Sequence, residues 1–439
     1  MELKRIEIMP GVWLSYLQTD KFKTACMSVT LLTQLRRESA AMNALIPLVL
    51  RRGTTRYRDM EAISARLDEL YGTAIEPVIR RIGEIQCLGF YASIPEGDFL
   101  PPGEDVLFQA TALMGEMLLS PATRGGLLLP QYVDSEREKM LDLIRSRINE
   151  KRSYATFRCI EEMCCCEDFA VSRLGGESEC QAIRYQKLSK HYRQLLQSCP
   201  VEVFYCGRAG ENQVVAALQN ALMTLPRGEL DLDIGTDVRM NALEEKPRYV
   251  EEVLDVTQGK LVLGFRLGEC MEDPDPAALY VFNALYGGSS TSKLFLNVRE
   301  RLSLCYYASS AVDIHKGLLL VSSGIAFDNL DAARDEILAQ LDAIRQGQIT
   351  DEELASARSG VASDLRSIVD GQGELEGFYL SQALDGAEYG PLELAELAEM
   401  VTRDQVQAIA QSVECDLIYF LRGEDAPEET TEEEQDDAE

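Results

Sequence analysis

Side chains that could bind a metal ion through nitrogen are scarce in this chain. Only two of its 439 residues are histidines, His191 and His315, and they lie 124 positions apart. A zinc site built on one helix needs two histidines about one turn apart, so the sequence contains no such motif. We expect His191 on a helix surface, His315 in a turn, and no metal ion bound to this chain.

The sulfur ligands are more numerous. The chain has twelve cysteines, including the run Cys164-Cys165-Cys166. Three adjacent cysteines cannot pair comfortably with one another, so free thiols in a reducing compartment are the simpler interpretation. A metal site drawn from Cys159, Cys164, Cys166 and Cys180 stays open as an alternative, although the sequence has no C-x-x-C pair.

Nucleophilic and phosphate-binding motifs are also missing. The sequence has no G-x-S-x-G nucleophile elbow, and a Cys–His dyad would have to use His191 or His315. The glycine pair Gly287-Gly288 follows an apolar helical stretch and precedes several Ser and Thr residues, which is typical of a helix C-cap followed by an N-cap. A phosphate-binding loop would need the spacing G-x-x-x-x-G-K-[ST], which this segment lacks.

The charge excludes one class of partner. The formal net charge is -30, from 43 Lys and Arg against 73 Asp and Glu, and 46% of the residues are hydrophobic. An acidic protein is a poor ligand for nucleic acid and favours basic or neutral peptides over polyanions. No apolar run is long enough for a membrane span, and the N-terminus lacks the apolar core of a secretory signal. These features indicate a soluble cytoplasmic protein.

The final segment, 424–439, is the most acidic part of the chain. It contains ten carboxylates and no basic residue. Such a segment cannot bury enough apolar surface to offset its ordering entropy, so we predict a disordered, solubilising tail.

The order of predicted elements occurs twice. In the first half, the pattern predicts a strand over 26–32, helices over 42–50 and 60–71, and strands over 74–79 and 84–94. Helices over 106–119 and 132–149 follow. In the second half, the same order recurs: a strand over 261–267, helices over 279–286 and 290–301, and strands over 305–312 and 317–323. A helix over 330–345 follows, and then a helix that opens with the capping box Thr350–Glu353. Each half closes with a polar helix, 188–197 or 402–412, and a strand that ends at Gly207 or Gly423.

The repeated order predicts an α+β protein of two homologous α/β sandwich domains, with antiparallel-rich sheets and helices packed on one face. The segment 226–247 is polar, contains glycine and lacks periodicity, so we interpret it as a linker. The predicted domains are therefore 1–225 and 248–423.

The segment 286–306 resembles the C-domain signature of the pitrilysin/insulinase metallopeptidase family. In that family a Gly-Gly-x-x-S-x-x-L-F stretch runs into V-R-E and then G-L-A-Y. The residues that match are Gly287, Gly288, Leu294, Phe295, Val298, Arg299, Glu300, Leu304 and Tyr306. Ser303 replaces the usual glycine, and Cys305 replaces the usual alanine. With the duplicated architecture, the resemblance covers most of residues 5–423 and implies sandwich domains of the mitochondrial-processing-peptidase/insulinase type.

The resemblance assigns a role to two residues of the second half. It implies that Arg299 and Tyr306 hold the substrate backbone and polarise the scissile carbonyl, since a guanidinium and a phenol can both donate to an oxygen that gains negative charge. The alternative is that Arg299 forms an ion pair on a helix surface and Tyr306 packs within its strand. Tyr307, on the opposite face of the strand, is the control residue.

The zinc-binding half of the family's machinery is degenerate in this sequence. Active members carry H-x-x-E-H on the first helix of the N-domain. Alignment on Gly53-Thr54 puts Ala44 and Leu48 at the histidine positions and Pro47 at the glutamate position, and none of these side chains can ligate a metal ion. The distal zinc glutamate would fall near Glu136 or Glu138, where a solvated helix-surface carboxylate is the alternative.

Some bacterial members of this family are heterodimers in which one subunit carries zinc and the other the Arg/Tyr pair. The resemblance therefore implies a non-catalytic subunit, without a cofactor of its own, that contributes Arg299 and Tyr306 to a peptide at the zinc of a paralogous partner bearing H-x-x-E-H. The alternatives are an inactive scaffold and a peptide-binding protein that forms homodimers.

Overall fold

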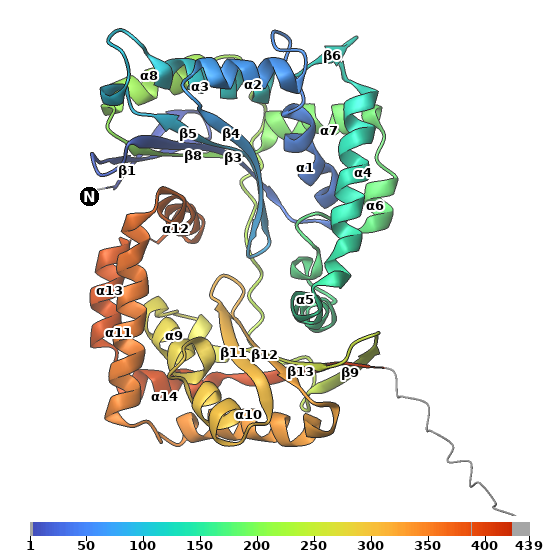
Figure 1. The fold of residues 1–439 in the computed structure, drawn as a ribbon, viewed down its shortest axis with the longest axis vertical. Coiled ribbons are helices and arrows are strands. Elements are labelled where there is room, and N and C mark those ends of the chain that lie inside the picture. Colours follow the sequence, from blue (N-terminus) through green and yellow to red (C-terminus); the bar gives the residue numbers. More distant parts are fainter. Residues whose placement is uncertain (1–2, 388, 424–439) are drawn as a thin grey trace, which may run out of the picture.

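A computed structural model describes residues 3–387 and 389–423 of the chain. The acidic segment 424–439, predicted to be a disordered tail, lies outside the described residues. The chain forms two β-sheets, one above the other in Figure 1, with helices around both. Within the described part of the chain, no helix is both long enough and apolar enough to cross a membrane.

The first sheet has six strands, and only its β2–β8 pair is parallel. From one edge to the other, the strands are β1 (Leu3–Met9), β2 (Val12–Gln18), β8 (Val201–Gly207), β3 (Thr24–Gln34), β5 (Ile85–Pro95) and β4 (Ala74–Ile82). The central strands read as nearly continuous apolar runs because both faces of the sheet are covered.

The second sheet has five strands in the equivalent order. From edge to edge these are β11 (Cys305–Asp313), β12 (Leu318–Ile325), β10 (Gly259–Arg266), β13 (Glu414–Arg422) and β9 (Arg248–Val253). Here too only one pair is parallel, β13 with β9. Both sheets are therefore antiparallel-rich, as the sequence predicts.

Helices of each half cover one face of that half's own sheet. In the first half these are α1 (Arg37–Leu50), α2 (Met60–Glu69), α3 (Val106–Leu119), α4 (Pro130–Ser146), α6 (Glu177–Gln181), α7 (Tyr185–Ser198) and α8 (Glu211–Ala221). In the second half these are α9 (Pro276–Asn283), α10 (Leu330–Arg345), α11 (Asp351–Ser367), α13 (Pro391–Met400) and α14 (Arg403–Ser412). The predicted capping box at Thr350 is formed, with Thr350 and Glu353 each bonding the other's backbone. A short hairpin of β6 (Thr123–Arg124) and β7 (Leu127–Leu128) precedes α4.

The two remaining helices cross between the halves. Helix α5 (Lys151–Met163) belongs to the first half by sequence but packs on the second sheet, where Gly264 leaves room for Met163 and Cys159. Helix α12 (Gln372–Asp385) belongs to the second half but packs on the first sheet, where its Tyr379 stacks on Phe204. Each sheet thus has its second face covered by the equivalent helix of the other half (Figure 1).

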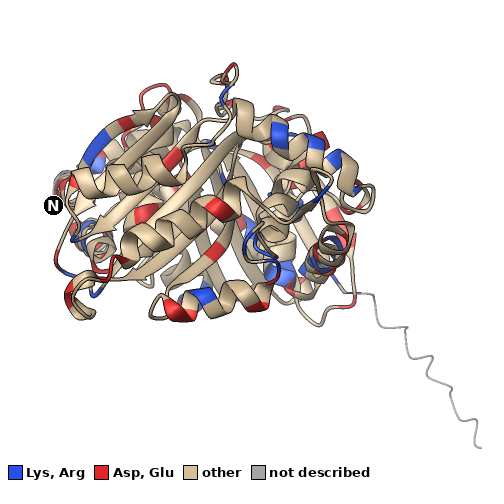
Figure 2. Ribbon diagram, turned by 90° about the horizontal axis from the view of Figure 1, so that it is seen from above, with Lys and Arg blue, Asp and Glu red and all other residues tan. Residues whose placement is uncertain are grey.

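The α+β class and the two similar sandwiches predicted from the sequence are confirmed. The predicted helix over 290–301 begins later, as the π-helical segment η6 (Leu294–Arg301), and strands β1, β2 and β9 were not predicted. Between α8 and β9 the chain contains no described helix or strand, and the domain boundaries at 225 and 248 stay predictions. Acidic and basic residues are interspersed along the elements visible in Figure 2.

Candidate functional site

The family signature forms a compact turn between α9 and β11. Helix α9 ends in the π-helical turn η5 (Ala284–Gly288), and η6 follows after a short loop. A Cβ atom on Gly287 would lie 2.7 Å from both Leu294 and Ser310, so only glycine allows this approach to β11. The space beside the glycine pair is filled by the chain's own side chains.

Ser303 joins η6 to β11 in a left-handed conformation. Its φ of +51° is a region that a non-glycine residue rarely adopts. The Leu304 N–H then donates to the Val298 carbonyl at 3.0 Å, which closes the reversal of the chain. Glycine adopts this left-handed conformation without a steric penalty, which explains the glycine that the family pattern has at the position of Ser303.

Arg299 lies in the last turn of η6 and is 41% exposed. Its Nε atom is 3.6 Å from a Glu300 carboxylate oxygen, and its guanidinium carbon is 4.6 Å from the centre of the Phe295 ring. The surface ion pair of the alternative interpretation exists, but it is long and solvated, so it contributes little to stability.

Tyr306 occupies a β-bulge at the start of β11. Cys305 pairs with Ile325 and Tyr307 with Gly324, which leaves Tyr306 as the extra residue between them. Its side chain is 66% exposed, and among the described residues its hydroxyl has no hydrogen-bond partner. Tyr306 therefore does not pack within its strand.

Tyr307 has the opposite environment. The guanidinium of Arg152, on α5, lies 4.1 Å from its ring centre, and the Ser322 hydroxyl donates to its phenol oxygen at 3.4 Å. Burial raises the pKa of the Tyr307 phenol. Tyr307 is thus a structural contact between α5 and the second sheet, whereas its neighbour Tyr306 is exposed.

The degenerate zinc positions lie on α1. Ala44 and Pro47 are buried and Leu48 is partly buried against the first core, so no donor atom projects from these positions. Among the described residues, no three His, Cys, Asp or Glu side chains lie close enough together to hold a metal ion. The residues present do not fit zinc.

Of the two candidate distal glutamates, one faces α1. Glu136 is buried on α4 and bonds Arg52, just after α1, at 3.1 Å and Lys139 at 2.8 Å. Glu138 is exposed and pairs with Arg137. Of the two candidates, Glu136 is the one beside α1, and its charge is taken up by basic side chains.

The placement of His191 differs from the prediction. It is half-buried, and its Nε2 lies 2.5 Å from the amide oxygen of Asn43, next to Ala44 on α1. The Asn43 amide nitrogen donates in turn to Gln86 on β5 at 2.9 Å. Burial lowers the pKa of His191, so it is a neutral link in a buried polar chain rather than a surface residue.

His315 lies in the β11–β12 turn, as predicted. Its Nδ1 is 2.7 Å from the Asp385 carboxylate, and its Nε2 is 3.0 Å from the Ser381 hydroxyl, both on α12. The His315 pKa is raised, because the Asp385 and Asp313 charges outweigh burial. A cationic His315 donates to both partners and links the second sheet to the crossing helix, so it is not placed to act as a general base.

The cysteines are all free. The four that could have formed a metal site are divided, since Cys180 lies in the core of the first half. Cys159, on α5, and Cys164, at the C-terminal end of α5, lie instead in the cluster between α5 and the second sheet. Cys165 and Cys166 are exposed, with their sulfur atoms 3.8 Å apart.

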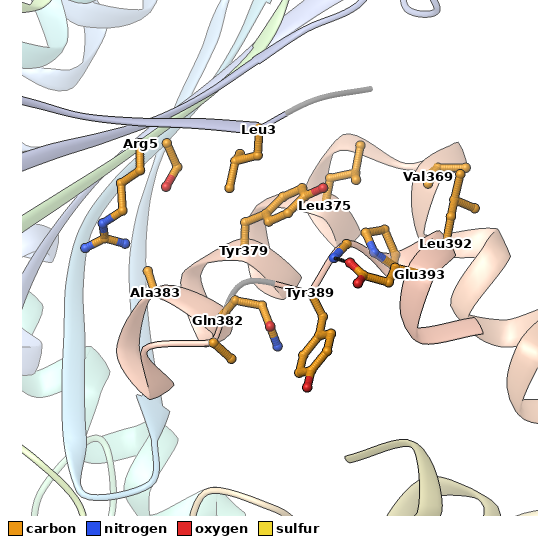
Figure 3. Close-up of a pocket in the computed structure, with 14 residues that line it drawn as sticks. Leu3, Arg5, Val369, Leu375, Tyr379, Gln382, Ala383, Tyr389, Leu392 and Glu393 are labelled. Atoms are coloured by element: carbon orange, nitrogen blue, oxygen red, sulfur yellow. Dashed lines mark hydrogen bonds between the residues drawn. The ribbon is translucent and has the colours of Figure 1, made fainter. Parts of the chain in front are cut away.

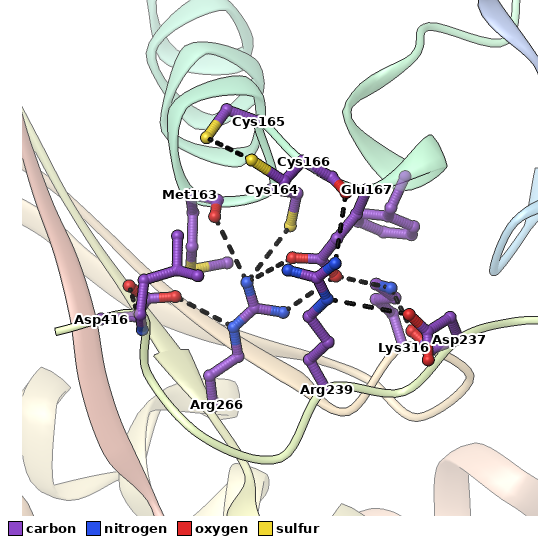
Figure 4. A network of polar contacts seen from close by, with 12 residues as sticks. Met163, Cys164, Cys165, Cys166, Glu167, Asp237, Arg239, Arg266, Lys316 and Asp416 are labelled. Atoms are coloured by element: carbon purple, nitrogen blue, oxygen red, sulfur yellow. Dashed lines mark hydrogen bonds and ion pairs between the residues drawn. The ribbon is translucent and has the colours of Figure 1, made fainter.

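A buried polar network lies beside the cysteine run (Figure 4). Arg266 on β10 is fully buried and donates to Glu167 at 2.6 Å and to Asp416 at 3.0 Å. Lys316, from the β11–β12 turn, is also fully buried, and its ammonium lies 2.6 Å from Glu167 and 2.7 Å from Glu84. The network joins both halves.

A cavity of about 590 Å³ lies between the β1–β2 edge and α12–α13 (Figure 3). Its lining includes the polar side chains of Arg5, Tyr379, Gln382 and Tyr389. The amide oxygen of Gln382 is buried without a hydrogen-bond partner among the described residues. Neither Arg299 nor Tyr306 lines this cavity.

Comparison with known proteins finds a family model and a relative that are both described as inactive. The family model described as the Peptidase M16 inactive domain matches residues 182–361. The probable inactive metalloprotease YmfF of Bacillus subtilis (strain 168) is 31% identical over 415 residues, 94% of this chain and 96% of that protein.

Solved structures of other proteins have the same fold. A conserved protein from Enterococcus faecalis V583 superposes with a TM-score of 0.88 at 25% identity, covering 97% of this chain and 99% of that one. A peptidase M16 inactive domain from Pseudomonas fluorescens superposes with a TM-score of 0.78 at 14% identity, over 97% and 99%. The chain therefore belongs to the M16 (pitrilysin/insulinase) metallopeptidase family, as one of its inactive members.

Proposed function

We propose that this chain is the non-catalytic subunit of a heterodimeric zinc metallopeptidase, in which it contributes Arg299 and Tyr306 to a peptide held at the zinc of a paralogous subunit. The partner would bear the H-x-x-E-H motif that this chain lacks at Ala44, Pro47 and Leu48. The observation that carries the proposal is the environment of Tyr306. Its exposed phenol has no hydrogen-bond partner among the described residues and lies on a bulge near the start of β11, a few residues after η6.

The chemistry of the two groups suits a carbonyl oxygen that becomes negatively charged. A guanidinium offers a fork of N–H donors and a permanent charge, and a phenol offers one O–H donor. Donors fixed before the reaction stabilise the developing charge without reorganisation. Arg299 is loosely held by Glu300 and Phe295, so a peptide carbonyl can compete for it.

The cytoplasm is the compartment that we propose. Twelve free cysteines, two of them adjacent and exposed, support a reducing environment.

The test has two stages. A tagged full-length chain is recovered from its native cell, and the complex is analysed by mass spectrometry and zinc quantitation. We expect an equimolar partner with H-x-x-E-H and about one zinc ion per pair. Recovery of this chain alone, without zinc, would contradict the proposal and favour an inactive scaffold.

The second stage measures peptide hydrolysis by the assembled complex. Arg299→Ala and Tyr306→Phe should each lower turnover by about 10²–10³-fold, the usual loss when one such donor is removed. Tyr307→Phe is the matched control, since it removes the same atom from the adjacent residue and should leave turnover unchanged. Equal losses in all three variants, or none in the first two, would refute the assigned roles.

A further inference from the structure

A groove of about 1010 Å³ follows the free edge of the first sheet, between β4, α4, α5 and residues 172–174. Its lining includes four arginines and no carboxylate. The arginines are Arg80, Arg81, Arg147 and Arg173. In a chain with 73 acidic and 43 basic residues, a groove of this composition is the opposite of the average surface.

Three of these arginines lack an acidic partner. Arg80 pairs with Glu376 on α12, across the sheet. Within residues 3–387 and 389–423, the other three form no ion pair with a carboxylate. The guanidinium of Arg81 instead donates to the Phe169 carbonyl at 2.6 Å and stacks 3.8 Å from the ring of the same residue.

Arg147 is held in a similar way. It donates to the Ser172 hydroxyl at 2.7 Å and lies 4.1 Å from the Phe157 ring centre. These neutral contacts fix the two guanidinium planes without neutralising their charge. Planar, fixed guanidinium groups are the geometry that binds a carboxylate through two parallel hydrogen bonds.

Arg173 completes the cluster. It is exposed, and no described residue bonds its guanidinium. Burial lowers the pKa of Arg81 and of Arg147, and the charge of Arg173 adds to this, against the opposing charges of Asp313 near Arg81 and of Glu161 near Arg147. The expectation from net charge, that the chain disfavours polyanions, therefore does not extend to this groove.

We infer that the groove is a docking site for the chain's own acidic segment, 424–439. That segment has ten carboxylates in sixteen residues and no basic residue, so its charge is complementary to the cluster. It follows Gly423, directly after β13, and helix α5 packs on β13 while also lining the groove. Helix α5 thus lines the groove and also packs on β13, the last strand of the described chain.

The length and the tether both favour this occupant over a free anion. Sixteen fully extended residues span at most about 58 Å. A segment attached to the same chain acts at an effective concentration on the order of millimolar, so it competes well against anions in solution. Docking there also covers part of the edge strand β4, and an uncovered edge can accept another strand.

The experiment uses full-length chains. In a neutral-tail variant, every Glu and Asp of 424–439 is replaced by Gln or Asn. A fluorescent synthetic peptide with the natural sequence 424–439 is then titrated with each protein at low salt, and its anisotropy gives Kd. We expect binding to the neutral-tail variant, and binding at least about tenfold weaker to the wild type, where the attached segment already occupies the groove.

Charge reversal locates the site. In the neutral-tail background, Arg173→Glu should weaken peptide binding by about tenfold or more, since it replaces a charge-assisted contact with repulsion. Arg37→Glu makes the same change at an exposed position outside the groove and should have little effect. The inference is overturned if the peptide does not bind the neutral-tail variant, if it binds the wild type equally well, or if the two charge reversals weaken binding equally.

Discussion

The buried ammonium of Lys316 lies 2.7 Å from the buried carboxylate of Glu84, and each residue comes from the turn region of an equivalent hairpin in a different half of the chain. Glu84 precedes β5 after β4, and Lys316 lies between β11 and β12. The same ammonium meets Glu167, which Arg266 also holds. The two halves are therefore joined where their equivalent hairpins meet, through charges that have no access to water.

Replacing Lys316 should destabilise the chain strongly. Lys316→Met leaves Glu84 and Glu167 buried without their shared cation, which typically costs about 3–5 kcal/mol of unfolding free energy. Lys190→Met, at an exposed position of α7, should change it by less than about 0.5 kcal/mol. Denaturant-induced unfolding measures both. A loss as small for Lys316→Met as for Lys190→Met would show that the buried ion pairs are not what joins the halves.

The link between His315 and α12 should weaken as pH rises. The pKa of His315 is raised above its ordinary value of 6.5, with Asp385 and Asp313 as the charged groups facing it. The folded state therefore holds this proton more tightly than the unfolded state. The stabilisation is complete below pH 6.5 and is lost as pH increases through the folded-state pKa.

The variant His315→Gln keeps a hydrogen-bonding side chain but cannot become charged. We expect its unfolding free energy to fall below that of the wild type at about pH 6 and to approach it at about pH 9. A difference between the two proteins that does not change with pH would contradict a cationic His315.

Glu202 should also make the unfolding free energy depend on pH, here through a buried carboxyl group. It is buried on β8, and burial raises its pKa from 4.5 to about 7, although Arg5 bonds it at 2.6 Å. Between those two pH values the folded state holds an extra proton, so unfolding free energy falls as pH rises from 4.5 to about 7, by about 3 kcal/mol in total. Glu202→Gln should remove this decline, and an unchanged profile in the variant would refute it.

Tyr306 and Tyr307 should separate function from stability. Tyr306→Ala should change unfolding free energy by less than about 1 kcal/mol, because the ring is largely exposed. Tyr307→Ala should lose about 2 kcal/mol, since it removes a half-buried ring and its contact with Arg152. Thermal and denaturant unfolding of the two variants give the comparison. A larger loss at Tyr306 would mean that it packs within its strand.

Several features follow from the sequence without a structure. Most strands and helices are predicted by periodicity, and the helix at Thr350 by its capping box, because these signals depend on residues within a few positions of one another. The missing zinc chemistry also follows from residue types, since two histidines 124 positions apart cannot form a helical zinc site in any fold. The bulge at Tyr306 has no such local signal, because it depends on the register of β12.

The tertiary structure alone decides which surfaces the elements cover. Neither helix α5 nor helix α12 was predicted from the sequence, and neither was the packing of each on the sheet of the other half. The bond between His191 and Asn43 joins residues 148 positions apart, and the groove brings Arg81, Arg147 and Arg173 together from three separate segments. Periodicity shows that a face is apolar and a charge count shows an excess, but neither identifies the distant surface that a residue meets. That is settled only when the whole chain packs, because the energy of burial does not depend on sequence separation.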